Sequence, residues 1–287
     1  MAPAPVPYLP RPSTRQVQLD RLGWTVGQRY IAYGLRIGLR ANDAAVLAAA
    51  GHYLPLGWQP APGGPVDVLY SLRLAAPDAA ADHLLFAGAV QLAATPEVAA
   101  LYPIFADHAQ LLTAFRARDR LFVHAGVVGW QDQAIVLPGR SLAGKTTLVK
   151  ALVEAGATYY SDEYAVLDQE GRVHPYPRPL AIRGAAGQPG QQTPVAALGG
   201  QAGTTPLPIG LIVVTHYASG ARWRPRALSP AQALLALMDN TVAARRAPHT
   251  SMPILRQAAL GASAIQSARG EAVGVAAALL GYRAGRR

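Results

Sequence analysis

The segment that constrains this chain most is residues 139–146, which reads GRSLAGKT and fits the pattern GxxxxGK[ST]. A loop of this kind needs a strand before it and a helix after it, because its backbone N–H groups and the positive end of the helix dipole converge on phosphate groups. Residues 133–138 form an apolar run of strand character, residues 146–154 have one apolar helical face, and Gly156 stands where a helix C-cap is expected. The sequence therefore predicts a strand–loop–helix unit that binds a nucleoside triphosphate. The alternative is a glycine-rich turn with an accidental lysine.

Each position of this loop is a candidate binding residue. Lys145 would reach the β- and γ-phosphates, and the Thr146 hydroxyl would bind Mg²⁺. The chain has 26 Lys and Arg residues, and its only lysines are Lys145 and Lys150, so a lysine retained in the loop indicates a need for a compact ammonium group. We therefore expect ATP and Mg²⁺ as cofactors. The predicted nucleotide-binding residues of the motif are Gly139, Arg140, Ser141, Leu142, Ala143, Gly144, Lys145, Thr146 and Thr147.

The composition excludes several other classes of protein. The 287 residues, 51% of them hydrophobic, are enough for a large core, and the absence of cysteine excludes thiol catalysis, disulfides and thiolate-bound metals. The net charge of +10 comes from scattered arginines without a zinc-finger or an aromatic-and-basic RNA motif, so we expect no nucleic-acid partner. No apolar stretch is long enough to span a bilayer, and the proline-rich residues 1–10 lack the features of a secretory signal. We expect a cytoplasmic protein with no membrane partner.

The periodicity of the chain predicts two domains after a lead-in. Residues 1–15 are proline-rich and predict a disordered lead-in. Residues 16–118 predict a small α+β module, and residues 119–287 a larger domain around the phosphate-binding motif. Residues 184–207 lack periodicity and predict a mobile loop or lid. Strands are predicted over 30–40, 66–74, 84–92, 121–130, 133–137, 157–160, 164–168, 172–176 and 207–215, and helices over 42–50, 97–118, 146–154, 229–239 and from 252 to the end.

An acidic pair, Asp162 and Glu163, follows the helix of the motif, at the end of what should be the neighbouring strand. Because ligands of open α/β sheets bind at the carboxyl ends of strands, we expect the pair to lie near the triphosphate and its Mg²⁺. One carboxylate can bind Mg²⁺, and the other can accept the proton of an attacking hydroxyl or water. The alternative is a turn or helix-capping pair. His124, on the strand before the motif, is either a core histidine with one hydrogen bond or a group that orients one carboxylate.

Taken together, His124-Ala-Gly, GRSLAGKTT and Tyr160-Ser161-Asp162-Glu163 resemble the HPr kinase/phosphorylase family. They are more similar still to the HPr-kinase-related kinases of bacterial biosynthetic and peptide-modification gene clusters. The resemblance covers about residues 121–184 and implies an α/β fold: a P-loop domain related to HPr kinase and phosphoenolpyruvate carboxykinase, with a small N-terminal α+β module and C-terminal helices. It implies Asp162 as the catalytic base and His124 as its histidine partner, beside Lys145 of the motif. The implied Mg²⁺ ligands are Thr146, Asp162 and Glu163.

One segment departs from the family pattern. HPr kinases have a glutamate in the sequence (I/L)E(I/V)RG, and residues 180–184 here read LAIRG, so Ala181 stands in its place. Arg183 remains as a candidate phosphate contact. Nothing in the chain is similar to the C-terminal loop that is linked to phosphorolysis in this family. The resemblance therefore does not extend to phosphorolysis or to HPr as the substrate.

These observations predict a Mg-ATP-dependent kinase that transfers the γ-phosphoryl group to a hydroxyl of a small molecule or of a peptide Ser or Thr. Because Ala181 replaces the family glutamate, the alternative is a catalytically inactive nucleotide-binding regulatory or scaffold protein of the same fold. A third hypothesis, transfer to a carboxylate or enol as in carboxykinases, lacks a further cluster of metal ligands. A homo-oligomer would allow Arg269 to act as a finger in a neighbouring subunit. The sequence does not identify the acceptor.

Overall fold

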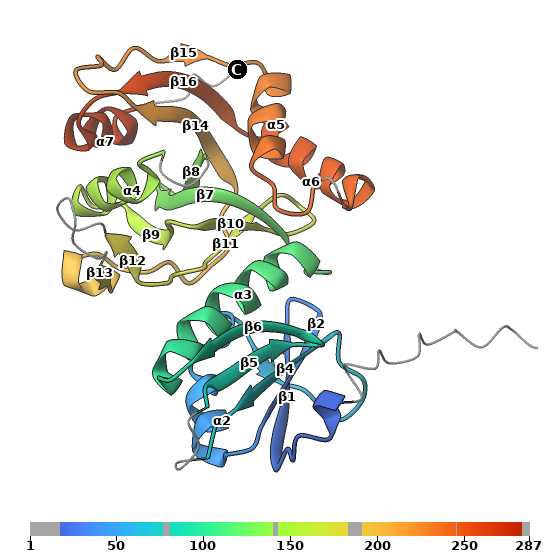
Figure 1. The fold of residues 1–287 in the computed structure, drawn as a ribbon. Helices are drawn as coiled ribbons and strands as arrows, with labels where there is room; N and C mark the ends of the chain where they lie inside the picture. Colours follow the sequence, from blue (N-terminus) through green and yellow to red (C-terminus); the bar gives the residue numbers. More distant parts are fainter. Residues whose placement is uncertain (1–17, 77–80, 140–142, 183–190, 245, 283–287) are drawn as a thin grey trace, which may run out of the picture. The chain divides into compact units, whose positions relative to one another are not determined.

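The computed structural model describes residues 18–76, 81–139, 143–182, 191–244 and 246–282, and the predicted lead-in over residues 1–15 lies outside them. The described residues form an α/β protein (Figure 1). The chain divides into two compact units, residues 1–113 and 114–287, so the division falls inside α3 (Leu101–Arg116). The sequence pattern predicts this boundary slightly later, between residues 118 and 119. Each unit has a sheet and a hydrophobic core of its own.

The N-terminal unit contains a six-stranded sheet. Its strands are β1 (Val26–Ala32), β2 (Leu35–Ala41), β3 (Gln59–Pro60), β4 (Val68–Arg73), β5 (His83–Ala87) and β6 (Val90–Thr95), in the order β3-β1-β2-β4-β5-β6. Since β2 and β4 are parallel, the chain crosses between them, and it does so through α2 (Ala44–Gly51). The Asp43 side chain caps this helix by accepting a hydrogen bond from the backbone N–H of Val46 at 3.0 Å. A short 3₁₀ helix, η1 (Val98–Ala100), leads into α3.

The predicted single strand over residues 30–40 is wrong, because this segment is the hairpin of β1 and β2. Tyr33 and Gly34 form its tip with φ of 50° and 76°, the positive values that a two-residue turn compatible with the strand twist requires. Ala32 and Leu35 flank the turn as cross-strand partners, and both face the core. The alternation of apolar residues therefore continues through the turn without a break. For this reason the sequence pattern does not reveal the turn.

The C-terminal unit contains an eight-stranded mixed sheet. Its strands are β7 (Leu121–Trp130), β8 (Gln133–Pro138), β9 (Thr158–Ser161), β10 (Tyr164–Leu167), β11 (Val173–His174), β14 (Ile209–Tyr217), β15 (Arg226–Ala227) and β16 (Ser263–Arg269). The order is β11-β10-β7-β8-β14-β16-β15, and β9 pairs with β7 beside β10. Three neighbouring strands, β8, β14 and β16, run parallel. Their carboxyl ends therefore lie at one edge of the sheet.

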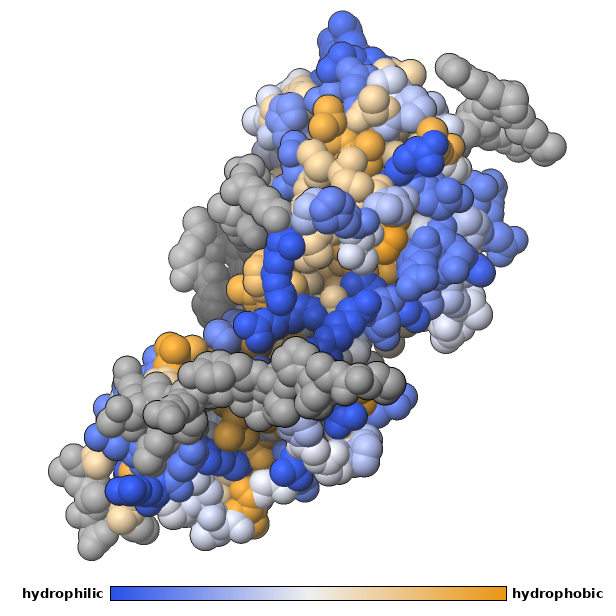
Figure 2. Space-filling model, turned by 90° about the vertical axis from the view of Figure 1, so that its right-hand side faces the viewer, coloured by the Kyte–Doolittle hydropathy of each residue, from blue (hydrophilic) through white to orange (hydrophobic). Residues whose placement is uncertain are grey.

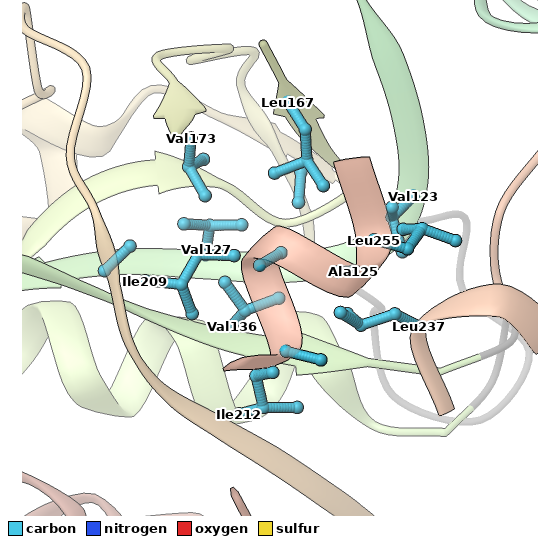
Figure 3. Packing of buried hydrophobic residues seen from close by; sticks show 14 of the residues in the cluster. Val123, Ala125, Val127, Val136, Leu167, Val173, Ile209, Ile212, Leu237 and Leu255 are labelled. Atoms are coloured by element: carbon cyan, nitrogen blue, oxygen red, sulfur yellow. The ribbon is translucent and has the colours of Figure 1, made fainter. Parts of the chain in front are cut away.

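Helices cover both faces of this sheet (Figure 1). They are α4 (Lys145–Glu154), α5 (Pro230–Asp239), α6 (Pro248–Leu260) and α7 (Ala272–Leu280). α4 packs beside α7 on one face, and α5 packs beside α6 on the other. Alternate residues of β7 serve the two cores, since Val127 belongs to the core under α5 and α6 and Val128 to the core under α4 and α7. Figure 3 shows the first core, in which Val127 and Val136 lie near Ile209 and Ile212.

The prediction of further helices from about residue 252 to the end is confirmed for α6 and α7, but it missed the strand between them. β16 lies between α6 and α7 and pairs in parallel with β14, from Ser263 opposite Leu211 to Arg269 opposite Tyr217. A parallel strand in the interior of a sheet is covered on both faces, so its sequence does not show the alternation of a half-exposed strand. The small residues Ala264 and Ala268 gave this stretch a helical composition.

The segment predicted as a mobile loop, residues 184–207, contains short regular elements in its described part, residues 191–207. β13 (Gln191–Thr193) pairs with β12 (Leu180–Ile182), and a 3₁₀ helix, η2 (Val195–Leu198), follows. The backbone N–H of Gly203 donates to the carbonyl of Tyr159 at 2.8 Å, which attaches this segment to β9. Residues 184–190 of the predicted loop lie outside the described residues.

Hydrophilic and hydrophobic residues are interspersed on the face of the molecule shown in Figure 2. The large hydrophobic residues with the greatest exposure, Val90, Leu111, Leu260 and Val273, come from separate elements. Single exposed apolar residues are normal on a folded surface and do not mark a partner site by themselves. Among the helices that the structure describes, none combines the length and the apolar composition needed to cross a bilayer.

Candidate active site

Gly139 and Gly144, near the two ends of the predicted phosphate loop, are fixed by the surrounding structure. The backbone N–H of Gly139 donates to the carbonyl of His124 on β7 at 3.1 Å, which holds the start of the loop against the sheet. Gly144 is the N-cap of α4 and has a φ of +78°, a left-handed conformation that favours glycine. Lys145 is the first residue of the helix and Thr146 the second, so both lie at the positive end of the helix dipole. The structure thus has the strand–loop–helix order that the motif predicts.

Not every predicted nucleotide-binding residue can be placed. Arg140, Ser141, Leu142 and Arg183 lie outside the described residues. Ala143 precedes the N-cap, and Thr147, at the third position of α4, is exposed.

The acidic pair lies at the edge of the sheet where β8 ends. β9 and β10 follow one another along β7, and Asp162 and Glu163 form the interruption between them. The carbonyl of Glu163 accepts a hydrogen bond from the backbone N–H of Ala125 at 3.1 Å, and Ala125 is the cross-strand partner of Pro138, the last residue of β8. The expectation that the strand before the acids is the neighbour of β8 is wrong, because β7 lies between them. The break between β9 and β10 nevertheless places the acids at the same height along β7 as the end of β8.

Asp162 contacts the helix that follows the loop. Its Oδ2 accepts a hydrogen bond from the Thr146 hydroxyl at 2.9 Å, and its Oδ1 lies 2.9 Å from the hydroxyl of Tyr159. The Tyr159 hydroxyl is also 2.7 Å from the carbonyl oxygen of Arg178, and because it has one proton it donates to one of these acceptors at a time. Burial, and then the charge of Asp162, raises the pKa of Tyr159, so the phenol stays protonated. These contacts fix the orientation of the carboxylate toward Thr146.

Glu163 faces a different partner. Its Oε2 forms an ion pair with Nη1 of Arg178 at 3.0 Å, and both side chains are about one-third exposed, at 36% and 30%. Arg178 lies between two prolines, 177 and 179, and its backbone N–H donates to the carbonyl of Tyr176 at 3.0 Å. These features restrict the backbone at Arg178. The more exposed carboxylate of the acidic pair has a cation beside it.

Two basic side chains, Lys145 and His124, influence one another near the start of α4. Burial lowers the pKa of the Lys145 ammonium, and the charges of Asp162 and Glu163 oppose this effect. Burial, and then the charge of Lys145, lowers the pKa of His124 below its ordinary value of 6.5. His124 is therefore a neutral imidazole at neutral pH, within the electrostatic reach of Lys145.

The expected contact between His124 and an acid is not formed by the described residues. The ring of His124 packs against Tyr164, its cross-strand partner, with 5.0 Å between ring centroids, and its Nδ1 is buried without a hydrogen-bond partner. Asp162 takes its hydrogen bonds from Thr146 and Tyr159 instead. The strand pairing explains this outcome, because it places Tyr164 rather than Asp162 opposite the histidine.

The lowered pKa of His124 predicts that the folded protein loses stability in mild acid. The folded protein resists protonation of this group, so its contribution to stability is complete above pH 6.5 and is lost as the pH falls through the lower folded-state pKa. We expect His124→Gln to reduce the fall in the free energy of unfolding between pH 7.5 and about pH 5, measured by urea denaturation. Equal falls in the two proteins would contradict the prediction.

Three residues that contact the site were not singled out for these roles by the sequence. Tyr159 and Arg178 reach the acidic pair, and nothing in their local pattern distinguishes them from core and surface residues. Arg269, the third, is buried, and its Nη2 donates to the carbonyl of Gly144 in the same chain at 2.7 Å. This contact within its own chain favours a local role for Arg269 over that of a finger in a neighbouring subunit. Its position at the end of a strand parallel to β8 is the signal that would have found it, once that strand is recognised.

The residues of the site would fit a magnesium ion that takes its remaining ligands from phosphate oxygens and water. The described residues contain no group of three or more His, Asp or Glu side chains that could hold a metal ion. Mg²⁺ usually takes one or two carboxylates together with phosphate oxygens and water. The adjacent hydroxyl of Thr146 and carboxylate of Asp162 provide oxygen ligands of that kind.

Comparison with known proteins adds no relative. No model of a known protein family matches the chain, and a search of curated proteins finds no match.

Proposed function

We propose that the protein is a Mg-ATP-dependent kinase with an α/β nucleotide-binding domain similar to that of HPr kinases. The observation that carries the proposal is the 2.9 Å hydrogen bond between the Thr146 hydroxyl and Asp162. It joins the helix after the GxxxxGK[ST] loop to the acidic pair, which a glycine-rich turn with an accidental lysine has no reason to do. It also separates the proposal from a turn-forming role of the acids, since Asp162 contacts α4 rather than its own turn.

The residues of the site divide the work of phosphoryl transfer. Lys145 and the first backbone N–H groups of α4 would bind the β- and γ-phosphates, while Thr146 and the acids would hold Mg²⁺. When bound, the metal ion neutralises negative charge on the phosphate oxygens. Most of the rate acceleration would come from orientation and from these fixed charges.

Asp162 is the proposed base. An acceptor hydroxyl oxygen forms a bond to the γ-phosphorus, the bond from that phosphorus to the bridging oxygen of ADP breaks, and the hydroxyl proton passes to the carboxylate. The products are ADP and a phosphate monoester. The acceptor is a small-molecule alcohol or a peptide Ser or Thr, and Arg178 would lie beside it on the more exposed side of the acidic pair.

Transfer of labelled phosphate tests the proposal. The protein is incubated with γ-³²P-labelled Mg·ATP and a bacterial extract separated into small-molecule and peptide fractions. The proposal predicts hydroxylamine-resistant label in an acceptor of one fraction, because a phosphate ester resists hydroxylamine and an acyl phosphate does not. Bound ATP whose label stays on the nucleotide would instead favour a regulatory or scaffold protein.

A conservative change at Tyr159 tests the positioning of Asp162. Tyr159→Phe keeps the ring but removes the hydroxyl that bonds to the carboxylate. We expect kcat to fall by about tenfold to a hundredfold, the size of effect seen when a hydrogen bond that orients a site ligand is lost. The dissociation constant for ATP, measured by calorimetry, should stay within about threefold, since the hydroxyl contacts Asp162 and the carbonyl of Arg178. Tyr160→Phe is the matched control, because the Tyr160 hydroxyl bonds to the carbonyl of Thr205, and unchanged kcat in Tyr159→Phe would contradict the prediction.

A further inference from the structure

A buried arginine contacts the N-cap of α4. Arg269 is the last residue of β16 and is 2% exposed. Its Nη2 donates to the carbonyl of Gly144 at 2.7 Å and its Nη1 to the carbonyl of Gly270 at 3.0 Å. Its guanidinium lies over the ring of Tyr217, the residue opposite it on β14, with 5.5 Å to the ring centroid. Strand pairing therefore places this cation at the N-cap of α4, although the two residues are 125 positions apart in the sequence.

The charge of Arg269 is not balanced by a neighbouring carboxylate. In the described part of the chain no Asp or Glu lies within ion-pair distance of the guanidinium, and its Nε is buried without a hydrogen-bond partner. Glu271 interacts with it at longer range, where it also accepts a hydrogen bond from the Tyr217 hydroxyl at 3.2 Å. Burying a cation without an anion is costly, and arginine cannot avoid the cost by losing its proton. Carbonyl oxygens offset part of the cost.

The contact with Gly144 connects this charge to the loop. The carbonyl of Gly144 also accepts the first hydrogen bond of α4, from the backbone N–H of Leu148 at 3.2 Å. A side chain at position 144 would clash with Nη2 of Arg269, and the φ of +78° would strain any residue other than glycine. Gly144 and Arg269 therefore fit one another. The orientation of the peptide group before Lys145 depends on both residues.

We propose that Arg269 is the positioning residue of the N-terminus of α4, and that its buried charge, which has no ion-pair partner among the described residues, favours a triphosphate at this helix end. The inference rests on the proposed nucleotide site. Arg269 does not touch the ligand, but holds the carbonyl of Gly144 so that the following N–H groups face the phosphates. It also places a fixed positive charge at the N-terminus of α4, where it adds to the helix dipole. Its contribution should grow with the number of phosphate groups on the ligand.

Calorimetric titration with ATP, tripolyphosphate and AMP tests this assignment in the full-length protein. Arg269→Gln is expected to weaken binding of ATP and tripolyphosphate tenfold or more, and binding of AMP threefold or less. Arg269→Lys should weaken ATP binding at least threefold, because one ammonium cannot reproduce the planar fork that spans both carbonyls. Arg226→Gln, a change at an exposed arginine of the adjacent strand β15, serves as the control and should bind like the wild type.

The outcomes separate this assignment from the kinase proposal. A merely structural role would lower the melting temperature and weaken all three ligands by the same factor, which would overturn the assignment. ATP affinity within twofold of wild type in Arg269→Gln would also overturn it, and if that variant does not fold, wild-type ATP affinity in Arg269→Lys has the same meaning. A wild-type protein that binds ATP and transfers no phosphate overturns the kinase proposal but leaves the role of Arg269 to be decided by these titrations. Failure of the wild type to bind ATP or tripolyphosphate overturns both.

Discussion

Replacing Lys145 by methionine is expected to abolish phosphoryl transfer, with a loss on the order of 10³-fold or more in kcat/KM. The ammonium lies at the start of α4, and burial together with the two acids sets its charge environment. Methionine keeps much of the length of the side chain and removes the charge that would bind the β- and γ-phosphates. Binding of Mg·ATP should weaken as well, because the same charge contributes to the ground state. Both effects are measured by steady-state kinetics and by calorimetry.

The chain contains a matched control for this change. Lys150 is the second lysine of the sequence and lies on the same helix, where it pairs with Glu154 at the surface. An exposed pair of this kind contributes about 0.5 kcal/mol or less, so Lys150→Met should leave kinetics and stability near those of the wild type. Equal losses in Lys145→Met and Lys150→Met would contradict a specific role of Lys145.

Replacing Asp162 by asparagine is expected to abolish transfer while sparing nucleotide binding. Asparagine has nearly the same shape, and its carbonyl oxygen can still accept the hydrogen bond from Thr146 and offer an oxygen to Mg²⁺, but it cannot take a proton. General-base catalysis contributes about 10²- to 10⁴-fold, so kcat should fall by about 10³-fold, with the dissociation constant for ATP within a few-fold of wild type. Single-turnover kinetics separates the chemical step from binding.

The control for Asp162 is an acid of the same unit that lies outside the site. Asp239→Asn, at the exposed end of α5, removes one negative charge without touching the loop. Its kinetics should match the wild type. Full transfer activity in Asp162→Asn would exclude Asp162 as the base. Glu163, the other member of the acidic pair, would then be the candidate base.

The local parts of the site were predictable from the sequence. The glycines, Lys145 and Thr146 define a loop whose geometry depends on neighbours in the chain, and the strand before it and the helix after it follow from short-range periodicity. The acidic pair was predictable for the same reason, since it follows α4 after one short strand. The α/β class follows from the same alternation of strands and helices.

The parts that depend on strand order were not predictable in this way. β9 was expected beside β8, but it pairs with β7. β10 pairs with β7 as well, and this second pairing places Tyr164 opposite His124. Arg269 reaches Gly144 through the parallel pairing of β8, β14 and β16, and the composition of β16 concealed that it is a strand. The order of strands in a sheet depends on packing throughout the core. A window of about ten to fifteen residues therefore does not reveal which strands pair.

The measurement that tests the central claim most directly follows the γ-phosphorus of ATP by ³¹P nuclear magnetic resonance. The wild-type protein, Mg·ATP and the small-molecule and peptide fractions of a bacterial extract are observed over time, beside the Asp162→Asn variant. The account predicts that the γ-phosphorus signal of ATP declines, that a phosphate-monoester signal grows in equal amount with ADP in one fraction, and that the variant shows neither change. ATP that is bound by the protein but keeps its γ-phosphorus signal unchanged in every fraction would contradict the account.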